Sequence, residues 1–340
     1  MKKISFINTH EAINVGNRLF ESETYELGDG LLTPFTEMRD AARLDGYDFA
    51  TYHLNPLETS NAVVCLDMPS VALQARIAKL SVPKYLFIFE CPLIRPDDWE
   101  SSQHAIFDRV FTYDRTRWRG GKYLNYAMPY SMRRTIVQSP KTRFMCLVAS
   151  NKVILRQRSG YDDRRDLIEY FRKTKMQGFD LYGRGWEFYV SASRLLNRLF
   201  ARFGSKAPWL RRFCTALPFY QGALVNKLQT ISQYKFIYCN ENFSHPGYLT
   251  EKILDAMWAG SVPVYSGPPD IDDFIPQNCY VAAHDFPSVR ALVDHLSTMS
   301  SAQYMDYLTN IQRFLESEKA HVFSSDSFYA GLKSVLDEDL

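Results

Sequence analysis

Short apolar runs alternate with longer amphipathic stretches along almost the whole chain. The short runs have the length and the β-branched or aromatic content of buried strands, whereas the longer stretches repeat their apolar residues at helical spacing. In the first half, the pattern predicts strands at 3–8, 48–53, 62–66, 84–89 and 109–113 and helices at 34–44 and 70–80. This alternation is typical of α/β proteins with parallel sheets.

A second series of elements begins after the polar stretch 133–143, which contains Ser139-Pro140 and is the best candidate for a linker. The pattern there predicts strands at 144–149, 179–183, 236–239 and 261–265, and helices at 162–173, 224–233, 251–259, 287–298, 301–317 and 326–337. We therefore expect an N-terminal domain over 1–138, a C-terminal domain over 139–325, and a C-terminal helix over 326–340.

Composition narrows the class of protein. At 340 residues with 46% hydrophobic content, the chain can bury a large core. Its six cysteines are scattered, which argues against a zinc site and a disulfide scaffold and favours a reducing compartment. The apolar run within residues 1–8 is too short for a signal peptide, and no segment reaches the length of a membrane span. We therefore expect a cytoplasmic protein.

Periodicity alone leaves several two-domain α/β proteins open, including a periplasmic-type binding protein and a dehydrogenase. No G-x-G-x-x-G follows the first strand, as a dinucleotide-binding domain would have. The net charge of +2 and the lack of a nucleic-acid motif argue against a nucleic-acid partner.

The most informative segment runs from Tyr234 to Tyr265 and reads as strand, polar loop, helix and strand. Thr250 is a plausible N-cap for the helix. Because the loop follows a parallel strand, it lies at the sheet edge where open α/β sheets bind ligands. Lys252 falls in the first helical turn, where a cation opposes the helix dipole, and this placement suits a bound anion.

Two runs in this segment, Gly247-Tyr-Leu-Thr-Glu-Lys252 and Ala259-Gly-Ser-Val-Pro-Val264, resemble the donor signature of the alpha-1,3/4-fucosyltransferase family. The resemblance covers roughly residues 143–285, with a weaker echo near Glu90. It implies a GT-B fold, with two Rossmann-like domains facing one another across a cleft. In that fold the N-terminal domain would bind the acceptor and the C-terminal domain the GDP-sugar.

The resemblance also implies an activity. We expect an inverting enzyme of the soluble bacterial type that moves fucose from GDP-fucose to a hydroxyl of an acceptor glycan. The linkage would be α-1,3, in a surface polysaccharide or glycolipid. Two alternatives stay open, namely a transferase for another GDP-deoxysugar and a non-catalytic nucleotide-sugar-binding protein.

The resemblance assigns the residues of the donor site position by position. Arg164 and Lys252 would hold the diphosphate, and Arg164 fits the spacing to the apolar residues of its helix better than Arg165 does. Either arginine could instead pair with neighbouring aspartates on a solvated helix face. The other donor-site positions are Ser150, Asn151, Asn242, Tyr248 and Glu251. Among them, Glu251 would bind the ribose, and Asn242 and Tyr248 the phosphate and sugar region.

One position departs from the family pattern. Asn240 stands where the family usually has an aromatic residue before Glu-Asn, and this residue affects the shape of the sugar pocket.

The general base is expected to be Glu90, which directly follows an almost wholly apolar strand. Burial at such a position raises the pKa of a carboxyl group, in the direction that a base at neutral pH requires. Glu90-Cys-Pro resembles the family's Glu-Ser-Pro, although an acid before a proline turn is commonly structural.

No obligatory metal or other cofactor is expected, because Arg164 and Lys252 can neutralise the diphosphate. Asp270-Ile-Asp272, with Asp273 beside it, reads as a turn rather than as a metal site.

A basic insertion spans about 190–225. No Asp or Glu lies between Glu187 and Glu241, and Arg194, Arg198 and Arg202 recur every four residues beside apolar side chains. Residues 191–213 therefore have the pattern of a helix on an anionic membrane surface, here the inner face of the cytoplasmic membrane, where the acceptor glycan could be lipid-linked. The alternative is a helical hairpin packed on its own domain.

Overall fold

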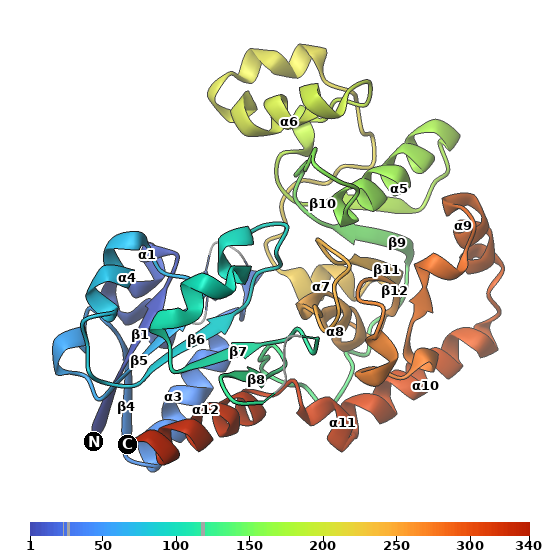
Figure 1. The fold of residues 1–340 in the computed structure, drawn as a ribbon. Coiled ribbons are helices and arrows are strands. Elements are labelled where there is room, and N and C mark those ends of the chain that lie inside the picture. Colours follow the sequence, from blue (N-terminus) through green and yellow to red (C-terminus); the bar gives the residue numbers. More distant parts are fainter. Residues whose placement is uncertain (23, 26–27, 117–119) are drawn as a thin grey trace. The chain divides into compact units, whose positions relative to one another are not determined.

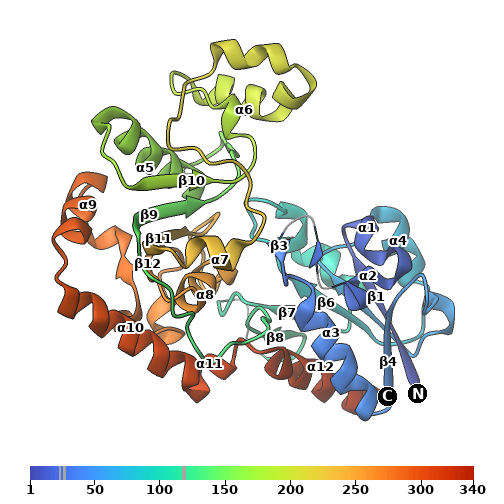
Figure 2. The ribbon, with the colours of Figure 1, turned by 180° about the vertical axis from the view of Figure 1, so that it is seen from behind.

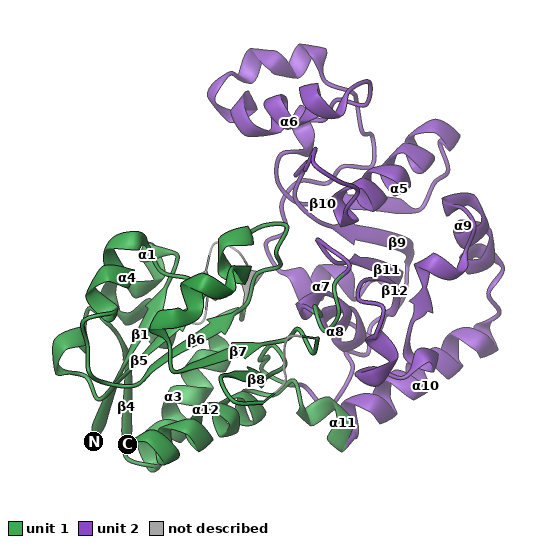
Figure 3. Ribbon diagram, viewed as in Figure 1, with its two compact units in different colours: residues 1–132, 245–249, 318–340 green, residues 133–244, 250–317 purple. Residues whose placement is uncertain are grey.

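The computed structural model describes residues 1–340 except 23, 26–27 and 117–119. The chain forms two compact units, shown in different colours in Figure 3. The first contains residues 1–132, 245–249 and 318–340, and the second contains residues 133–244 and 250–317. Each unit is built on a parallel sheet of its own.

The first unit has a six-stranded sheet in the order β4-β1-β5-β6-β7-β8. Its strands are β1 (Lys2–Asn8), β4 (Tyr47–Thr51), β5 (Ala62–Leu66), β6 (Lys84–Ile88), β7 (Arg109–Thr112) and β8 (Tyr123–Asn125). The central strand β5 is buried along its whole length, which explains why its sequence is continuously apolar. A separate antiparallel pair is formed by β2 (Thr24–Tyr25) and β3 (Gly28–Asp29).

The helices of this unit come from both ends of the chain. They are α1 (Glu11–Asn14), α2 (Arg18–Glu21), α3 (Thr33–Leu44), α4 (Val71–Ile77), α11 (Glu318–His321) and α12 (Ser325–Asp339). Helix α12 packs against α3 and adds Phe328 to the core, where its ring lies 4.7 Å from that of Phe87. On its other side Phe87 stacks on Phe111 at 4.1 Å. The core of the first unit therefore depends on residues from the end of the described chain.

The second unit has a five-stranded sheet in the order β10-β9-β11-β12-β13. Its strands are β9 (Arg143–Val148), β10 (Phe179–Tyr182), β11 (Tyr234–Asn240), β12 (Val262–Ser266) and β13 (Val281–Ala282). Its helices are α5 (Gly160–Thr174), α6 (Arg194–Phe203), α7 (Lys227–Ile231), α8 (Glu251–Trp258), α9 (Val289–Thr298) and α10 (Ser301–Glu316). Figures 1 and 2 show these elements from opposite sides.

Apolar side chains of α5 and α9 share one core cluster with alternate residues of the sheet, while α8 packs against β11 and β12. The central strand β11 pairs with β9 on one side and β12 on the other. The carboxyl end of β11 therefore lies in the middle of the sheet edge, close to the start of α8.

The predicted elements agree with the structure except at some ends. The helix expected at 224–233 is shorter: it begins at Lys227, where Asn226 caps it through a hydrogen bond from Gln229 N, and it ends at Ile231. Strands β8 and β13 were not predicted, because runs of three and two residues show no periodicity. Of the described helices, none combines the length and the apolar character needed to cross a bilayer.

Candidate active site

Glu241 organises the loop between β11 and α8. The residue is 1% exposed, and its carboxylate accepts hydrogen bonds from Thr250 N at 2.9 Å and the Thr250 hydroxyl at 2.7 Å. It also accepts from the Tyr265 hydroxyl at 3.1 Å and from Lys252 Nζ at 3.0 Å. One buried carboxylate thus joins the end of β11, the start of α8 and the neighbouring strand β12.

Thr250 occupies the N-cap position of α8 as expected, but its side chain does not cap the helix. The hydroxyl donates to Glu241 instead and accepts a hydrogen bond from Lys252 Nζ at 2.6 Å. The predicted N-cap position is therefore confirmed, and a buried anion takes the hydroxyl that would otherwise cap the helix. The cation in the first turn of α8 also has a local partner in Glu241.

Arg164 lies near the start of α5 and is 4% exposed. Its guanidinium donates to the side chain of Asn240, to Asn240 O at 2.7 Å and to Asn242 Oδ1 at 3.0 Å. Asn240 in turn donates to Gly160 O at 2.9 Å, so this amide holds both the arginine and the first residue of its helix. These contacts are to neutral oxygens and leave the positive charge of the guanidinium in place.

Arg165 points elsewhere. Its guanidinium donates to the backbone carbonyls of Val190 and Ser191 and lies over the ring of Tyr189 at 5.2 Å. The structure therefore places Arg164, rather than Arg165, beside Asn240 and Asn242.

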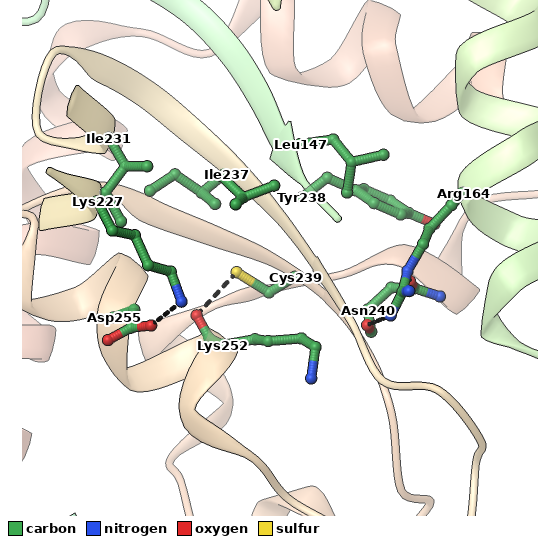
Figure 4. Close-up of a pocket in the computed structure, with 11 residues that line it drawn as sticks. Leu147, Arg164, Lys227, Ile231, Ile237, Tyr238, Cys239, Asn240, Lys252 and Asp255 are labelled. Atoms are coloured by element: carbon green, nitrogen blue, oxygen red, sulfur yellow. Dashed lines mark hydrogen bonds and ion pairs between the residues drawn. The ribbon is translucent and has the colours of Figure 1, made fainter. Parts of the chain in front are cut away.

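Arg164 and Lys252 line one pocket together with Lys227 and Asp255 (Figure 4). Lys227 forms an ion pair with Asp255 at the end of the pocket nearer α7. Burial lowers the pKa of Lys252, but the charges of Glu241 and Glu251 outweigh it, and the pKa is raised above the usual value for lysine. Lys252 is therefore a permanent cation at neutral pH.

Glu251 stays ionised beside these cations. Burial raises the pKa of its carboxyl group, but Lys252 and Lys227 outweigh that effect and lower the pKa to about 2. The Glu251 side chain is 36% exposed, and its Oε1 lies 3.7 Å from Lys252 Nζ. A half-buried carboxylate at a helix start can accept hydrogen bonds from a diol, as the predicted ribose contact requires.

Of the seven predicted donor residues, Arg164 and Lys252 line this pocket, whereas Ser150, Asn151, Asn242, Tyr248 and Glu251 do not. Asn151 is buried, and its amide bonds Gly185 O at 2.9 Å and the side chain of Asn197 at 3.3 Å. It lines a different pocket, with Asn197 and Arg194. Ser150 is exposed. The structure therefore joins Arg164, Asn242, Glu251 and Lys252 around the end of β11, and it gives the side chain of Asn151 structural partners.

Glu90 lies in the first unit, two residues after the end of β6 at Ile88, and is half-buried. Its backbone is held on both sides: Asp67 Oδ1 accepts from Glu90 N at 3.1 Å, and Glu90 O accepts from Trp99 Nε1 at 3.0 Å and the Tyr113 hydroxyl at 3.2 Å. Its Oε2 is buried and has no hydrogen-bond partner among the described residues. A fixed backbone and an oxygen with spare accepting capacity suit a group that takes a proton from a ligand.

The carboxyl group of Asp67, which accepts a hydrogen bond from Glu90 N, has a perturbed pKa. Burial, followed by the neighbouring carboxylate of Asp98, raises the pKa of Asp67 far above its usual range, against the opposing effect of hydrogen bonds from Phe89 N and Glu90 N. Asp67 therefore favours the protonated state.

Tyr248 belongs to the same unit as Glu90, although Thr250 belongs to the other. Its ring lies 5.2 Å from that of Tyr113, and its hydroxyl forms a hydrogen bond with Cys91, the neighbour of Glu90. At Gly247, where φ is +74°, a Cβ atom would lie 2.1 Å from Tyr113 O. A close backbone approach thus holds the 245–249 loop against the Glu90 region, and His245 adds a contact to Asp114 at 3.2 Å.

The aspartates after β12 have structural contacts. Asp272 and Asp273 lie in a short helix, Ile271–Asp273, and Asp272 accepts from the Tyr280 hydroxyl at 2.5 Å. Across the described residues, no three His, Cys, Asp or Glu side chains gather as metal ligands would. The expectation that the protein needs no metal stays a prediction.

Residues 213–327 match the family model for glycosyltransferase family 10 (fucosyltransferase), C-terminal part. This segment contains Glu241, Lys252 and the whole loop between them. Over this third of its length, the chain is similar to glycosyltransferase family 10.

Among curated relatives, the alpha-(1,3)-fucosyltransferase FucT of Helicobacter pylori is 34% identical over 120 residues. That alignment covers 34% of this chain and 25% of the relative, so the chain spans about a quarter of that protein in the match.

Similarity of fold extends over the whole chain. A crystal structure of an alpha1,3-fucosyltransferase aligns with 100% of this chain and 91% of its own, with a TM-score of 0.57 at 17% identity. Another, determined with GDP-fucose, aligns with 93% of this chain and 91% of its own, with a TM-score of 0.51 at 16% identity. The predicted fold class, α/β of the GT-B type, is confirmed.

Sequence reasoning missed Glu241 as the centre of the loop and Asn240 as the support of Arg164. A signal was present for Glu241, since a carboxylate directly after a buried strand needs partners. Lys227 was also missed as a pocket residue, because its helix is only five residues long.

Proposed function

We propose that this protein is an inverting fucosyltransferase that transfers fucose from GDP-fucose to a hydroxyl group of an acceptor glycan, in α-1,3 linkage. The observation that carries the proposal is the arrangement of Arg164 and Lys252 at the carboxyl end of β11, with Lys252 inside the segment that matches family 10. The relatives named as α-1,3-fucosyltransferases support the choice of sugar and linkage.

In the proposed reaction, the acceptor oxygen attacks the anomeric carbon and the bond from that carbon to the β-phosphate oxygen breaks. The electron pair of the broken bond stays on GDP, whose diphosphate is stabilised by Arg164 and Lys252. The acceptor proton passes to Glu90 as general base. Attack from the side opposite to GDP inverts the configuration, and the two cations support a reaction without a metal ion.

Asn240 favours a second candidate donor. Its small amide stands at a position where the family usually has an aromatic residue, and a changed pocket wall could admit another GDP-deoxysugar. A missing or added hydroxyl changes recognition most where the site is built to hydrogen-bond it. GDP-fucose therefore has to be compared with other GDP-sugars.

The test is GDP release from each GDP-sugar, with and without a panel of galactose- and N-acetylglucosamine-containing acceptors. We expect acceptor-dependent release with GDP-fucose, a loss of at least about a hundredfold in Glu90→Gln, and an unchanged thermal shift with GDP in that variant. Lys252→Ala should lose both release and the thermal shift. Glu100→Gln and Lys235→Ala change exposed residues of the same charges and serve as matched controls.

A GDP-induced thermal shift without release from any donor would favour a nucleotide-sugar-binding protein. Release with another GDP-sugar but not with GDP-fucose would favour the second candidate. If GDP gave no thermal shift at all, the assignment of this pocket as the donor site would be wrong.

A further inference from the structure

Helix α6 and the turns after it form a lobe of the second unit that lies beyond β10, away from the rest of the sheet (Figures 1 and 2). We call residues 191–213 the α6 lobe. It consists of α6, a short turn at Gly204–Lys206 and a second short helix, Pro208–Phe213. The lobe takes no part in the donor pocket.

The inner side of the lobe is fixed by a polar residue and a glycine. Asn197 is 1% exposed, donates to Asn151 Oδ1 at 2.9 Å and accepts from Val190 N at 2.9 Å. Gly204 lies against Phe188, where a Cβ atom would come within 2.3 Å of the ring. These two positions are seven residues apart and therefore share one face of the helix.

The outer side is apolar and exposed. Leu195 and Leu199 lie nearly opposite Asn197 on the helix and are 55% and 42% exposed. The other exposed apolar side chains of the lobe are Leu196 (44%), Phe203 (46%), Trp209 (60%) and Phe213 (57%). The lobe packs on Trp186–Phe188 of its own unit, as the packed-hairpin alternative expects, but these six apolar side chains stay 42–60% exposed. The amide of Asn197 is buried, and the leucines face outward.

The charged side chains of the lobe are all positive, although Arg194 pairs with Asp162 at 2.9 Å and Arg211 with Glu187 at 4.0 Å in the same unit. Residues 191–213 contain six arginines and lysines and no Asp or Glu. Arg198 and Arg202 are exposed on one flank of α6. Arg212 lies over the rings of Trp209 at 5.3 Å and Phe213 at 4.7 Å. Cations and aromatic rings therefore alternate along the same exposed surface.

We infer that the α6 lobe binds the surface of an anionic lipid bilayer. Exposed leucines flanked by arginines are the arrangement in which an amphipathic helix places its apolar face below the headgroups and its cations among the phosphates. Tryptophan and phenylalanine beside the cations suit the boundary between headgroups and acyl chains. A nucleic acid would match the charge but would leave the leucines exposed to water.

This inference does not rest on the proposed transferase activity, because the lobe residues are separate from the donor pocket. If both hold, the lobe would bring the enzyme to acceptor glycans carried on lipids.

The test is sedimentation of the full chain with vesicles of phosphatidylcholine alone and of phosphatidylcholine with one-quarter phosphatidylglycerol. We expect at least about tenfold tighter binding to the anionic vesicles, since each cation near the surface contributes a several-fold effect. Arg198→Gln with Arg202→Gln should weaken that binding about tenfold. Leu195→Ser with Leu199→Ser should weaken it similarly. Lys173→Gln with Lys235→Gln removes two exposed charges elsewhere on the unit and should change it less than twofold.

A second measurement locates the contact. Quenching of tryptophan fluorescence by brominated lipid should occur in the unmodified chain and fall strongly in Trp209→Phe. Unchanged circular dichroism and melting temperature would show that the variants fold, as expected for substitutions on the outer side.

Four results would overturn the inference. One is failure to bind anionic vesicles, and another is binding that none of the lobe variants reduces. The third is a dimer in light scattering that the leucine variants dissociate, which would make the surface a contact between two copies. Binding to duplex nucleic acid that depends on the arginines but not on the leucines, without vesicle binding, would identify a general polyanion surface instead.

Discussion

Replacing Glu241 by glutamine tests the central contact of the loop between β11 and α8. The change keeps the size of the side chain but removes its charge, so Lys252 loses the carboxylate 3.0 Å from its Nζ. Glu251, at 3.7 Å and 36% exposed, is the more distant partner that stays. Glutamine also presents an amide N–H₂ group where Glu241 accepted hydrogen bonds.

The magnitude follows from burial. Removing one partner of a buried ion pair typically costs about 3–5 kcal/mol, because the other charge is left uncompensated. The Lys252 side chain is 21% exposed, so water recovers part of this cost. We expect Glu241→Gln to lower the free energy of unfolding by about 2–4 kcal/mol.

Urea unfolding followed by circular dichroism measures this loss, and a double-mutant cycle with Lys252→Met isolates the pair. The double variant has no uncompensated cation, so it should be more stable than the sum of the single losses predicts, by about 1–3 kcal/mol. Glu251→Gln is the matched control, and its more exposed carboxylate should contribute about 1 kcal/mol or less to the same quantity.

The reasoning would be refuted if Glu241→Gln lost less than about 0.5 kcal/mol, the usual range for surface substitutions. Strict additivity in the cycle would also refute it, because two residues in contact should couple. In either case Glu241 would not hold Lys252, and the local explanation for a cation at the start of α8 would fail.

Three further substitutions have defined outcomes. Gly247→Ala should destabilise the fold by about 2 kcal/mol or more in thermal unfolding, because the new Cβ would meet Tyr113 O and φ is +74°; an unchanged melting temperature would contradict this. Asn240→Ala removes the amide that holds the guanidinium of Arg164, so we expect KM for the GDP-sugar to rise about tenfold or more. Asn240→Asp, measured in parallel, should retain the oxygen that accepts the hydrogen bond from Arg164. Burial raises the pKa of Glu169, but hydrogen bonds from Arg172 and other donors outweigh it and lower the pKa to about 2. Its stabilising effect is therefore present above about pH 5 and is lost as the pH falls toward 2, so Glu169→Gln should cost about 1–2 kcal/mol at pH 7 and almost nothing at pH 2 in unfolding experiments.

The sheets could be predicted because their strands are buried on both faces. Ala62–Leu66 has no exposed position and reads as an unbroken apolar run, and Lys84–Ile88 is similar. The strands at the far edges are too short to show a period: Val281–Ala282 has two residues. Their pairing is decided by the neighbouring strand, which local sequence does not reveal.

In the candidate site, positions along one helix could be predicted and contacts across loops could not. Arg164 was separated from Arg165 by helical spacing, and the dipole argument drew attention to Lys252. The contact of Lys252 with Glu241 requires the intervening loop to close over eleven positions, which no local pattern shows. Likewise, the periodicity of α6 identified an apolar face, but it did not show that Asn197 is the buried residue of the helix.

The return of α12 to the first unit determines when that unit can fold during synthesis. Phe328, Leu332 and Leu336 belong to the same core as Phe6, in the first strand. A ribosome therefore has to make nearly the whole described chain before the earliest strand receives its last neighbours, whereas the second unit is complete once residue 317 has emerged. The later sheet can form while the earlier one still exposes apolar surface, and contacts that span nearly three hundred residues, such as that of Tyr47 with Asp337, make the earlier one the slower to form.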